Sequence, residues 1–339
     1  MPEPVVPPDG RSPAAKPKLL VVELWGLGDL AIATPFLQAA SRKYAVTLLA
    51  KPHARDLQAR FWPEASVVPF TAPWTAFKRK YRLWSWPWRE IMALRRRLAA
   101  EHFDFGVSGR WDPRDHLLLK FAGVKNRIGF PRVGSGIFLT ESLVRPDAQA
   151  HIYESWRLAG NALGIELPPR NQAVRQLSRA GKLILVHSGA RLPARVWPLD
   201  HYRSLVRHLR ESHYAVQVAC DPDQQAWWQE SGEAAACPRT VAELLSLVDQ
   251  ASVFIGNCSG SGHLAAISGA PTFTLFGPSL PQWFAPIHPA AEWIEGMPCP
   301  YRPCADYCRF SVPHCLHDLS EETVLPRVRD FLARHADSI

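Results

Sequence analysis

The sequence predicts an α/β protein built from two domains, each with a parallel sheet. Short apolar runs typical of buried parallel strands recur along the chain, and each is followed by a polar or glycine-containing turn and a helix-compatible segment. The pattern stops in a polar, proline-containing stretch at residues 166–181 and restarts at Leu183–His187, LILVH. We therefore expect a linker there, between a domain over residues 18–170 and a second over residues 181–339.

Composition bounds the class of protein. The chain has 339 residues, with 47% hydrophobic and 21% charged residues, which is typical of a globular protein of two domains. It has no apolar run of the length that crosses a membrane. Residues 1–17 are proline-rich and lack the apolar segment of a secretory signal, so we expect a disordered leader. The net charge of +8 favours acidic partners, such as phosphorylated glycolipids, an anionic membrane or nucleic acid.

The first strand is predicted at Lys18–Trp25 and runs into the turn GLGD. Asp29 then follows the carboxyl end of the strand, the edge at which open α/β sheets bind ligands. Thr34-Pro35 suits the N-cap and first residue of a helix. The helix could instead begin just after Gly28 and bend at Pro35, and the sequence leaves both starts open.

Further strands are predicted at Ala45–Ala50 and Asp104–Ser108, and the second of these brings Ser108–Arg110 to the same edge. Between them, Trp74–Leu98 interleaves tryptophans with lysines and arginines. This mixture fits a peripheral membrane or glycolipid-binding surface, and single-stranded nucleic acid would use similar groups. A plain surface loop followed by a helix with its leucines towards the core explains it as well, so the three interpretations stay open.

The second domain opens with Ser188 and Gly189 after the strand LILVH. Arg191 and Arg195 follow in the loop before a helix predicted at Leu199–Leu209. Two arginines beside a turn of small residues suit a diphosphate, because guanidinium groups pair with phosphate oxygens through two parallel hydrogen bonds.

Residues 253–278 carry the strongest pattern, a strand, a Gly/Ser turn, a helix and a second strand at Thr272–Phe276. The glycines and serines of the turn are followed by helix-compatible residues from His263 to Ile267, and Gly269 suits the end of the helix. A helix that opens on such a turn presents unpaired N–H groups and a positive dipole end, which bind phosphate. An ordinary turn between a strand and a helix is the alternative.

Three other segments have structural explanations. Ala215–Ala219 is a predicted strand that ends near Asp221, and Thr240 with Glu243 forms a capping box before a helix over 241–250. Ser320–Leu332 is predicted as an amphipathic C-terminal helix.

Four of the seven cysteines lie in residues 299–315, namely Cys299, Cys304, Cys308 and Cys315. Four soft ligands on a short irregular loop suit a closed structural site for Zn or Fe, in which His314 or His317 could replace one cysteine. Free buried thiols and disulfides are the alternatives.

The glycine turns resemble those of glycosyltransferase family 9, the lipopolysaccharide heptosyltransferases. GNCSGSGHLAA at residues 256–266 is similar to the family's nucleotide-sugar signature, the next strand ends in Phe276-Gly277-Pro278, and Gly-Asp-x-x-x-x-Thr-Pro at 28–35 is similar to its N-terminal motif. Some members also carry a C-terminal cysteine cluster, which binds iron in one branch. Cys258 stands where the family usually has Asp.

The resemblance covers most of residues 18–335 and implies a GT-B fold, two Rossmann-like domains facing each other across a cleft. The N-terminal domain would take the acceptor and the C-terminal domain the nucleotide-sugar. The last helix would pack back on the first domain.

The resemblance also implies the roles of single residues in an inverting transfer. Asp29 is the expected catalytic base, Arg195 the expected contact to donor phosphate, and Asp221, Asp223 or Gln224 the expected contact to the ribose. The expected donor-binding residues are Ser188, Gly189, Arg191, Arg195, Asp221, Cys258, Ser259, Gly260, Ser261, Gly262 and His263, and the expected acceptor-side residues are Gly28, Thr34 and Arg110. An ADP-linked heptose is the family's usual donor, and its chemistry needs no catalytic divalent metal.

The expected partners are therefore a nucleotide-sugar, a glycan or glycolipid acceptor and an anionic membrane surface, while nucleic acid is not expected. We expect a cytoplasmic protein that can lie on the inner membrane face. Two alternatives stay open, a non-catalytic binding protein of the same fold and a nucleotide-sugar epimerase. The sequence does not predict the oligomeric state.

Overall fold

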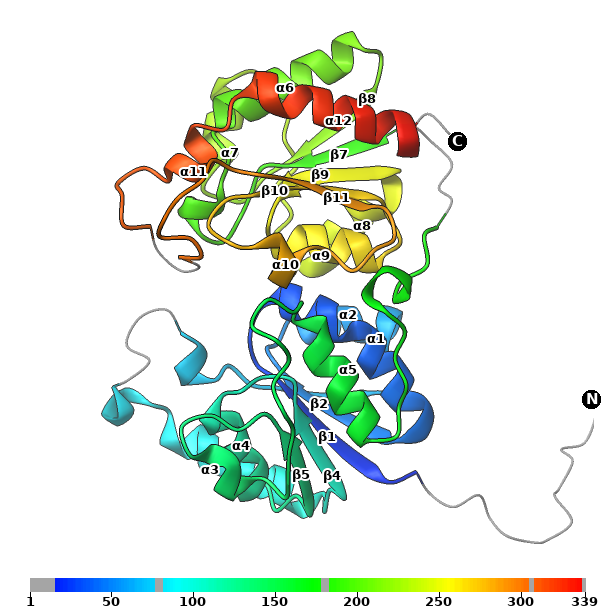
Figure 1. Ribbon diagram of the computed structural model, residues 1–339, viewed down its shortest axis with the longest axis vertical. Helices are drawn as coiled ribbons and strands as arrows, with labels where there is room; N and C mark the ends of the chain where they lie inside the picture. Colours follow the sequence, from blue (N-terminus) through cyan, green and yellow to red (C-terminus); the bar gives the residue numbers. More distant parts are fainter. Residues whose placement is uncertain (1–15, 77–81, 178–182, 305–307, 337–339) are drawn as a thin grey trace, which may run out of the picture.

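The computed structural model describes residues 16–76, 82–177, 183–304 and 308–336, and the described residues form two parallel sheets, one above the other in Figure 1. All but the last two residues of the expected leader lie outside the described residues. No helix in these ranges combines the length and the apolar character needed to cross a bilayer.

The first sheet has the order β3-β2-β1-β4-β5-β6. Its strands are β1 (Lys18–Glu23), β2 (Ala45–Ala50), β3 (Ser66–Pro69), β4 (Phe105–Ser108), β5 (Asn126–Gly129) and β6 (Glu141–Ser142). Alternate residues of β1 enter different cores. Leu19 and Val21 pack under the helices α1 (Leu27–Lys43), α2 (Ala54–Phe61) and α5 (Tyr153–Ala162), whereas Leu20 and Val22 pack under α3 (Trp88–Ala100) and α4 (Pro113–Phe121). Helices therefore cover both faces, as a parallel sheet requires.

Of the two predicted starts of the first helix, the one just after Gly26-Leu27-Gly28 is close to the observed start, and the one with Thr34 as N-cap is wrong. Helix α1 begins at Leu27, so Thr34 is not an N-cap and Pro35 lies inside the helix. The physical reason is Asp29, whose carboxylate accepts a hydrogen bond from the backbone N–H of Gly26 at 2.8 Å and so caps the earlier start. Thr34 is buried, and its hydroxyl donates to the Leu30 carbonyl at 3.1 Å.

The second sheet has the order β11-β10-β9-β7-β8. Its strands are β7 (Leu183–His187), β8 (Ala215–Ala219), β9 (Val253–Asn257), β10 (Thr272–Phe276) and β11 (Ala291–Glu295), and its helices are α6 (Leu199–Glu211), α7 (Gln225–Glu230), α8 (Val241–Gln250), α9 (Gly260–Ile267), α10 (Pro281–Phe284), α11 (His314–His317) and α12 (Glu321–His335). The predicted capping box is confirmed, because the Thr240 hydroxyl accepts from the Glu243 N–H at 3.1 Å.

The C-terminal helix α12 packs on α6 and β11 in the second domain. Val324, Val328 and Phe331 are fully buried in the same core as β7 and β10. The expectation that this helix packs on the first domain was wrong, because its apolar face packs into the core of the second domain.

The two domains meet where the amino-terminal parts of α1 and α9 pack together. One apolar core is continuous across this contact, from Leu30 and Ala31 of α1 to Leu264 and Ala265 of α9. A Cβ atom on Gly28 would lie 2.8 Å from the His263 ring, so only glycine allows this close approach. The interface therefore brings the two predicted glycine turns together.

Candidate functional site

Asp29 and Arg110 meet at the point where the order of the first sheet reverses, between β1 and β4. The Arg110 guanidinium forms an ion pair with one oxygen of the Asp29 carboxylate, and the other oxygen caps α1 at Gly26. The side chain of Asp29 keeps 20% of its surface exposed. A carboxylate has about four lone-pair sites, so these two contacts leave room for a further proton donor.

Glu23, at the carboxyl end of β1, lies behind this pair and was missed in the sequence. One of its oxygens accepts from the Trp25 N–H at 3.1 Å, and the other lies 3.8 Å from Nε of Arg110. Burial raises the pKa of Glu23 to about 8, with Asp29 adding to the shift and Arg110 opposing it. Burial disfavours the charge of Arg110, but the neighbouring carboxylates outweigh it, so the pKa of Arg110 is raised.

Basic groups from both domains surround this cluster. Lys51 follows β2 and is half-buried, and its pKa is lowered by burial and by the charge of Arg191 from the second domain. The pKa of His53 is lowered by burial, then by Lys51, with a further contribution from Arg191. The loops after β2 and β7 therefore bring positive charge to one place, and neither Lys51 nor His53 stood out in the sequence.

In the second domain, Asn257 holds the loop that follows β7. Its side-chain N–H donates to the Ser188 carbonyl at 2.7 Å, and its oxygen accepts from the Trp197 N–H at 3.0 Å. Ser188 is fully buried, and its hydroxyl donates to Gln224 at 2.8 Å and accepts from Trp228 at 3.0 Å. Both side chains thus fasten the loop that carries Arg191 and Arg195.

Gly189 lies against the carboxylate of Asp221, because a Cβ atom on Gly189 would come within 2.4 Å of it. His187, at the end of β7, lies 4.0 Å from Asp221 and 3.4 Å from the Ser261 hydroxyl. Burial lowers the pKa of His187 and raises that of Asp221. A neutral imidazole therefore connects the loop after β8 with the turn before α9, a connection that the sequence did not indicate.

The turn into α9 leaves its backbone N–H groups without a capping side chain. Ser259 is the N-cap residue with no side-chain cap bond, because its hydroxyl pairs instead with the Ser261 hydroxyl at 2.7 Å. Uncapped amides at a helix start bind anions. His263 faces Asp29 across the domain contact, and burial lowers its pKa to about 4, with Asp29 opposing the shift.

Cys258 lies between this turn and the arginines. It is buried against Phe276 and Ala285, and burial raises the pKa of its thiol to about 11, with Arg195 opposing the shift. A neutral thiol therefore stands where the resembling family usually has a carboxylate, so the surroundings of Arg195 carry one negative charge less than in that pattern.

The four C-terminal cysteines lie close together, since burial and the charges of Cys308 and Cys299 raise the pKa of Cys304. All are free thiols. In the part of the chain that the structure describes, however, no group of three or more His, Cys, Asp or Glu side chains has the arrangement that holds a metal. Residues 305–307 of this loop lie outside that part, so the Zn or Fe site stays a prediction.

The structure brings most of the predicted residues to one region but not all. Gly28 and Asp29 adjoin His263 of α9 and Arg110 pairs with Asp29, whereas the buried hydroxyl of Thr34 accepts from Trp62 at 3.2 Å and faces the interior. Glu23, Lys51 and His187 were missed, and their only sequence signal is that each ends or directly follows a strand.

The family model of glycosyltransferase family 9 (heptosyltransferase) matches residues 91–310. Lipopolysaccharide heptosyltransferase 2 of Escherichia coli strain K12 is 28% identical over 119 residues, which are 30% of this chain and 33% of that protein. The matched part thus spans about a third of the length of this curated relative.

Solved structures share the whole architecture. E. coli heptosyltransferase WaaC with ADP matches with a TM-score of 0.73 and 17% identity, over 93% of this chain and 99% of that one. The iron-containing dodecameric glycosyltransferase TibC from enterotoxigenic E. coli H10407 matches with a TM-score of 0.57 and 17% identity, over 96% and 80%. At these identities the likeness shows the fold, two Rossmann-like domains in a GT-B arrangement.

Proposed function

Because the chain belongs to glycosyltransferase family 9, we propose that it transfers a sugar, by family default a heptose, from an ADP-linked donor to a lipopolysaccharide-type or other glycan acceptor. The resemblance implies inversion at the anomeric carbon. Residues 18–170 would carry the acceptor and residues 181–339 the nucleotide-sugar.

One observation supports this proposal above the others. Gly28 and Asp29 adjoin His263 of the α9 turn across the domain contact, so a carboxylate of one domain lies beside the turn of the other domain that we propose as the phosphate site. A transferase needs this combination, a base for the acceptor and a phosphate site for the donor, within one cleft.

In the proposed reaction, the Asp29 carboxylate takes the proton of the acceptor hydroxyl as its oxygen attacks the anomeric carbon from the face opposite the diphosphate. The Arg110 ion pair and the Gly26 N–H hold the carboxylate in one orientation. The diphosphate leaves with the electrons of the broken C–O bond. Arg195 and the amides at the start of α9 would stabilise its charge, which is the main electrostatic requirement of this step.

The cysteine loop would have a structural role in this scheme. The related TibC is described as iron-containing, and Cys299, Cys304, Cys308 and Cys315 are the residues that would hold Zn or Fe here. A thiolate-held metal would join these four cysteines to one another, and no step of the transfer depends on it.

The proposal is tested by thermal unfolding of the wild type and Arg195→Ala with ADP-, UDP-, GDP- and CMP-sugars. ADP-sugars should raise the melting temperature of the wild type, since a ligand at about a hundred times its dissociation constant adds about 2.7 kcal/mol. Arg195→Ala should lose most of this shift, and Arg207→Ala, on the exposed side of α6, should keep it.

Two other results would replace this function. If no nucleotide-sugar stabilises the wild type, the proposed donor site is excluded. A wild type that isomerises the nucleotide-sugar without acceptor would be an epimerase, whereas a transferase should at most hydrolyse it slowly.

A further inference from the structure

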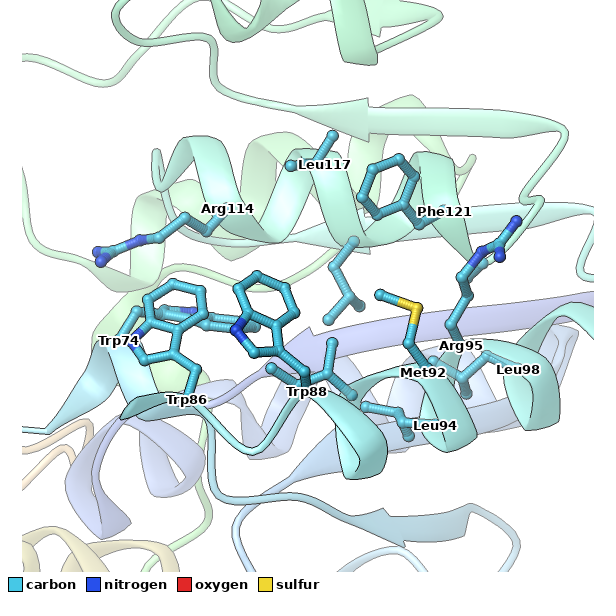
Figure 2. Close-up of a pocket in the computed structure, with 13 residues that line it drawn as sticks. Trp74, Trp86, Trp88, Met92, Leu94, Arg95, Leu98, Arg114, Leu117 and Phe121 are labelled. Atoms are coloured by element: carbon cyan, nitrogen blue, oxygen red, sulfur yellow. The ribbon is translucent and has the colours of Figure 1, made fainter. Parts of the chain in front are cut away.

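An apolar pocket of about 140 Å³ opens between α3 and α4, on the face of the first sheet opposite α1 (Figure 2). Its walls include Trp74, Trp86, Trp88, Met92, Leu117 and Phe121. Arg95 and Arg114 line it as well, and long basic side chains of this kind pack their apolar stems on such walls. Arg95 is exposed, whereas the Arg114 guanidinium pairs with the Asp112 carboxylate at 2.6 Å. One wall of the pocket thus belongs to the Trp74–Leu98 stretch, for which the sequence left three interpretations open, and the other belongs to α4.

The pocket is not ordinary core. Its rim residues Trp88, Met92 and Phe121 are 45%, 38% and 50% exposed, and neighbouring Trp84 is 81% exposed. Single exposed apolar side chains are normal, but a contiguous group around a hollow marks a binding surface. A dry apolar cavity of about 150 Å³ is large enough to bind benzene, so this one admits the end of a hydrocarbon chain.

The charges around the pocket select an anionic partner. Arg95 lines the pocket, and Arg82, Arg89, Arg96 and Arg97 lie on α3 or in the segment just before it. All five are exposed, and within the described ranges none of them pairs with a carboxylate, whereas Arg114 pairs with Asp112. Glu90 is the single acidic residue of α3. Exposed tryptophan and leucine beside a row of arginines is the composition of helices that lie in the headgroup region of a membrane.

We propose that the surface formed by this pocket and the five arginines docks on an anionic membrane, with the end of a lipid acyl chain in the pocket and the arginines on the phosphates. The inference does not depend on the proposed transfer, because none of these residues belongs to the Asp29 cluster. The position of this surface suits a glycolipid acceptor. Helix α4, which forms one wall of the pocket, begins at Pro113, three residues after Arg110 of the candidate site.

The first test measures sedimentation of the full chain with vesicles of phosphatidylglycerol and phosphatidylethanolamine, compared with phosphatidylcholine. The wild type should bind the anionic vesicles alone, more weakly as salt rises. Arg95→Gln/Arg96→Gln should bind about thirtyfold more weakly, since each arginine near such a surface contributes about fivefold. Arg327→Gln/Arg329→Gln, which removes two exposed arginines from α12, should bind like the wild type.

The pocket itself is tested by Met92→Gln/Phe121→Gln, which changes two exposed rim residues and leaves the core intact. Binding should fall about tenfold, whereas Ile137→Gln/Val144→Gln, at 77% and 86% exposed sites outside the pocket, should not change it. Vesicle lipids brominated on their acyl chains should quench the tryptophan fluorescence of the wild type. The quenching should be smaller in Trp84→Phe/Trp88→Phe, whereas the control Trp227→Phe should keep it.

Several outcomes would overturn the inference. Equal binding to both vesicle types excludes this surface as the docking site. So does binding that is weakened neither by Arg95→Gln/Arg96→Gln nor by Met92→Gln/Phe121→Gln. Failure to bind vesicles together with arginine-dependent binding of a single-stranded oligonucleotide assigns it to nucleic acid. Self-association that Met92→Gln/Phe121→Gln abolishes, without vesicle binding, assigns the pocket to a second copy. ADP-sugar stabilisation, measured on each variant, reports separately on the proposed transfer.

Discussion

The two candidate ligand-binding edges of this protein are built from different kinds of chemical group. In the first domain, Glu23, Asp29 and Arg110 bring ionisable groups from the ends of β1 and β4 into contact. In the second, the turn before α9 offers backbone amides and small side chains, and its buried polar groups, Ser188 and Asn257, hold loops in place. In the proposed transfer, the first edge works through a carboxylate that titrates, and the second through fixed backbone dipoles together with the charge of Arg195.

In the proposed transfer, this difference gives the two edges different tasks. Proton transfer needs a group that changes its charge, and such groups lie in the first domain. Stabilising a diphosphate needs donors that are already oriented and need not move when charge develops, and such donors lie in the second. The comparison therefore predicts that variants of the first edge change the rate and its pH dependence, and that variants of the second change nucleotide affinity or stability.

The largest effect is expected for Asp29→Asn. The amide can still accept from the Gly26 N–H, but it cannot take a proton from the acceptor, so the transfer rate should fall by about 10²–10⁴-fold. ADP-sugar stabilisation should remain. Asp200→Asn, an exposed acid in the first turn of α6, is the matched control in the same two assays. A variant that keeps the wild-type rate would exclude Asp29 as the base.

The next effect is expected for Glu23→Gln, which should change how the free energy of unfolding depends on pH. The pKa of Glu23 is about 8 in the folded protein and near 4.5 when unfolded, so between these values the folded state binds the additional proton. The wild type should therefore lose stability relative to Glu23→Gln as pH rises from about 4.5 to about 8, by at most about 1.4 kcal/mol per pH unit.

The comparison is made by chemical unfolding of both proteins across this pH range. The opposite pH dependence of His263, whose pKa is lowered to about 4, is present in both proteins and cancels in the difference. Glu141→Gln, an exposed carboxylate on β6, should run parallel to the wild type. A Glu23→Gln difference that stays constant with pH would show that Glu23 is already ionised in the folded state.

The second edge was largely predictable from sequence, because its information is local. Strand β9, the glycine turn, helix α9 and strand β10 follow one another within residues 253–276, and each has its own pattern. The strand Leu183–His187 and the helix after Thr240 were predicted with the right bounds for the same reason.

The first edge was predicted in part, because its contacts join distant residues. Asp29 stands out beside a glycine turn, but its pairing with Arg110 spans 81 residues and depends on β1 and β4 being neighbours in the sheet. Glu23 reads as one polar residue at the end of an apolar strand. Short edge strands such as β3 and β11 were also missed, since each has only four or five residues and little apolar pattern.

The smallest effect is expected for Ser188 at the second edge, where the test is whether this residue stabilises the fold or contacts the ligand. Ser188 was expected to bind the donor, yet its hydroxyl lies in the interior between Gln224 and Trp228. Ser188→Ala should cost about 1–3 kcal/mol of unfolding free energy, because the Trp228 N–H is left buried without its acceptor. The nucleotide dissociation constant should change less than twofold.

The dissociation constant is measured by titration of ADP, with Ser231→Ala as the control for losing a serine hydroxyl bonded to the same helix. A tenfold loss of ADP affinity in Ser188→Ala, with stability unchanged, would make Ser188 a donor contact. The second edge would then bind through a side chain as well as through its amides, and the division of tasks between the two edges would be narrower.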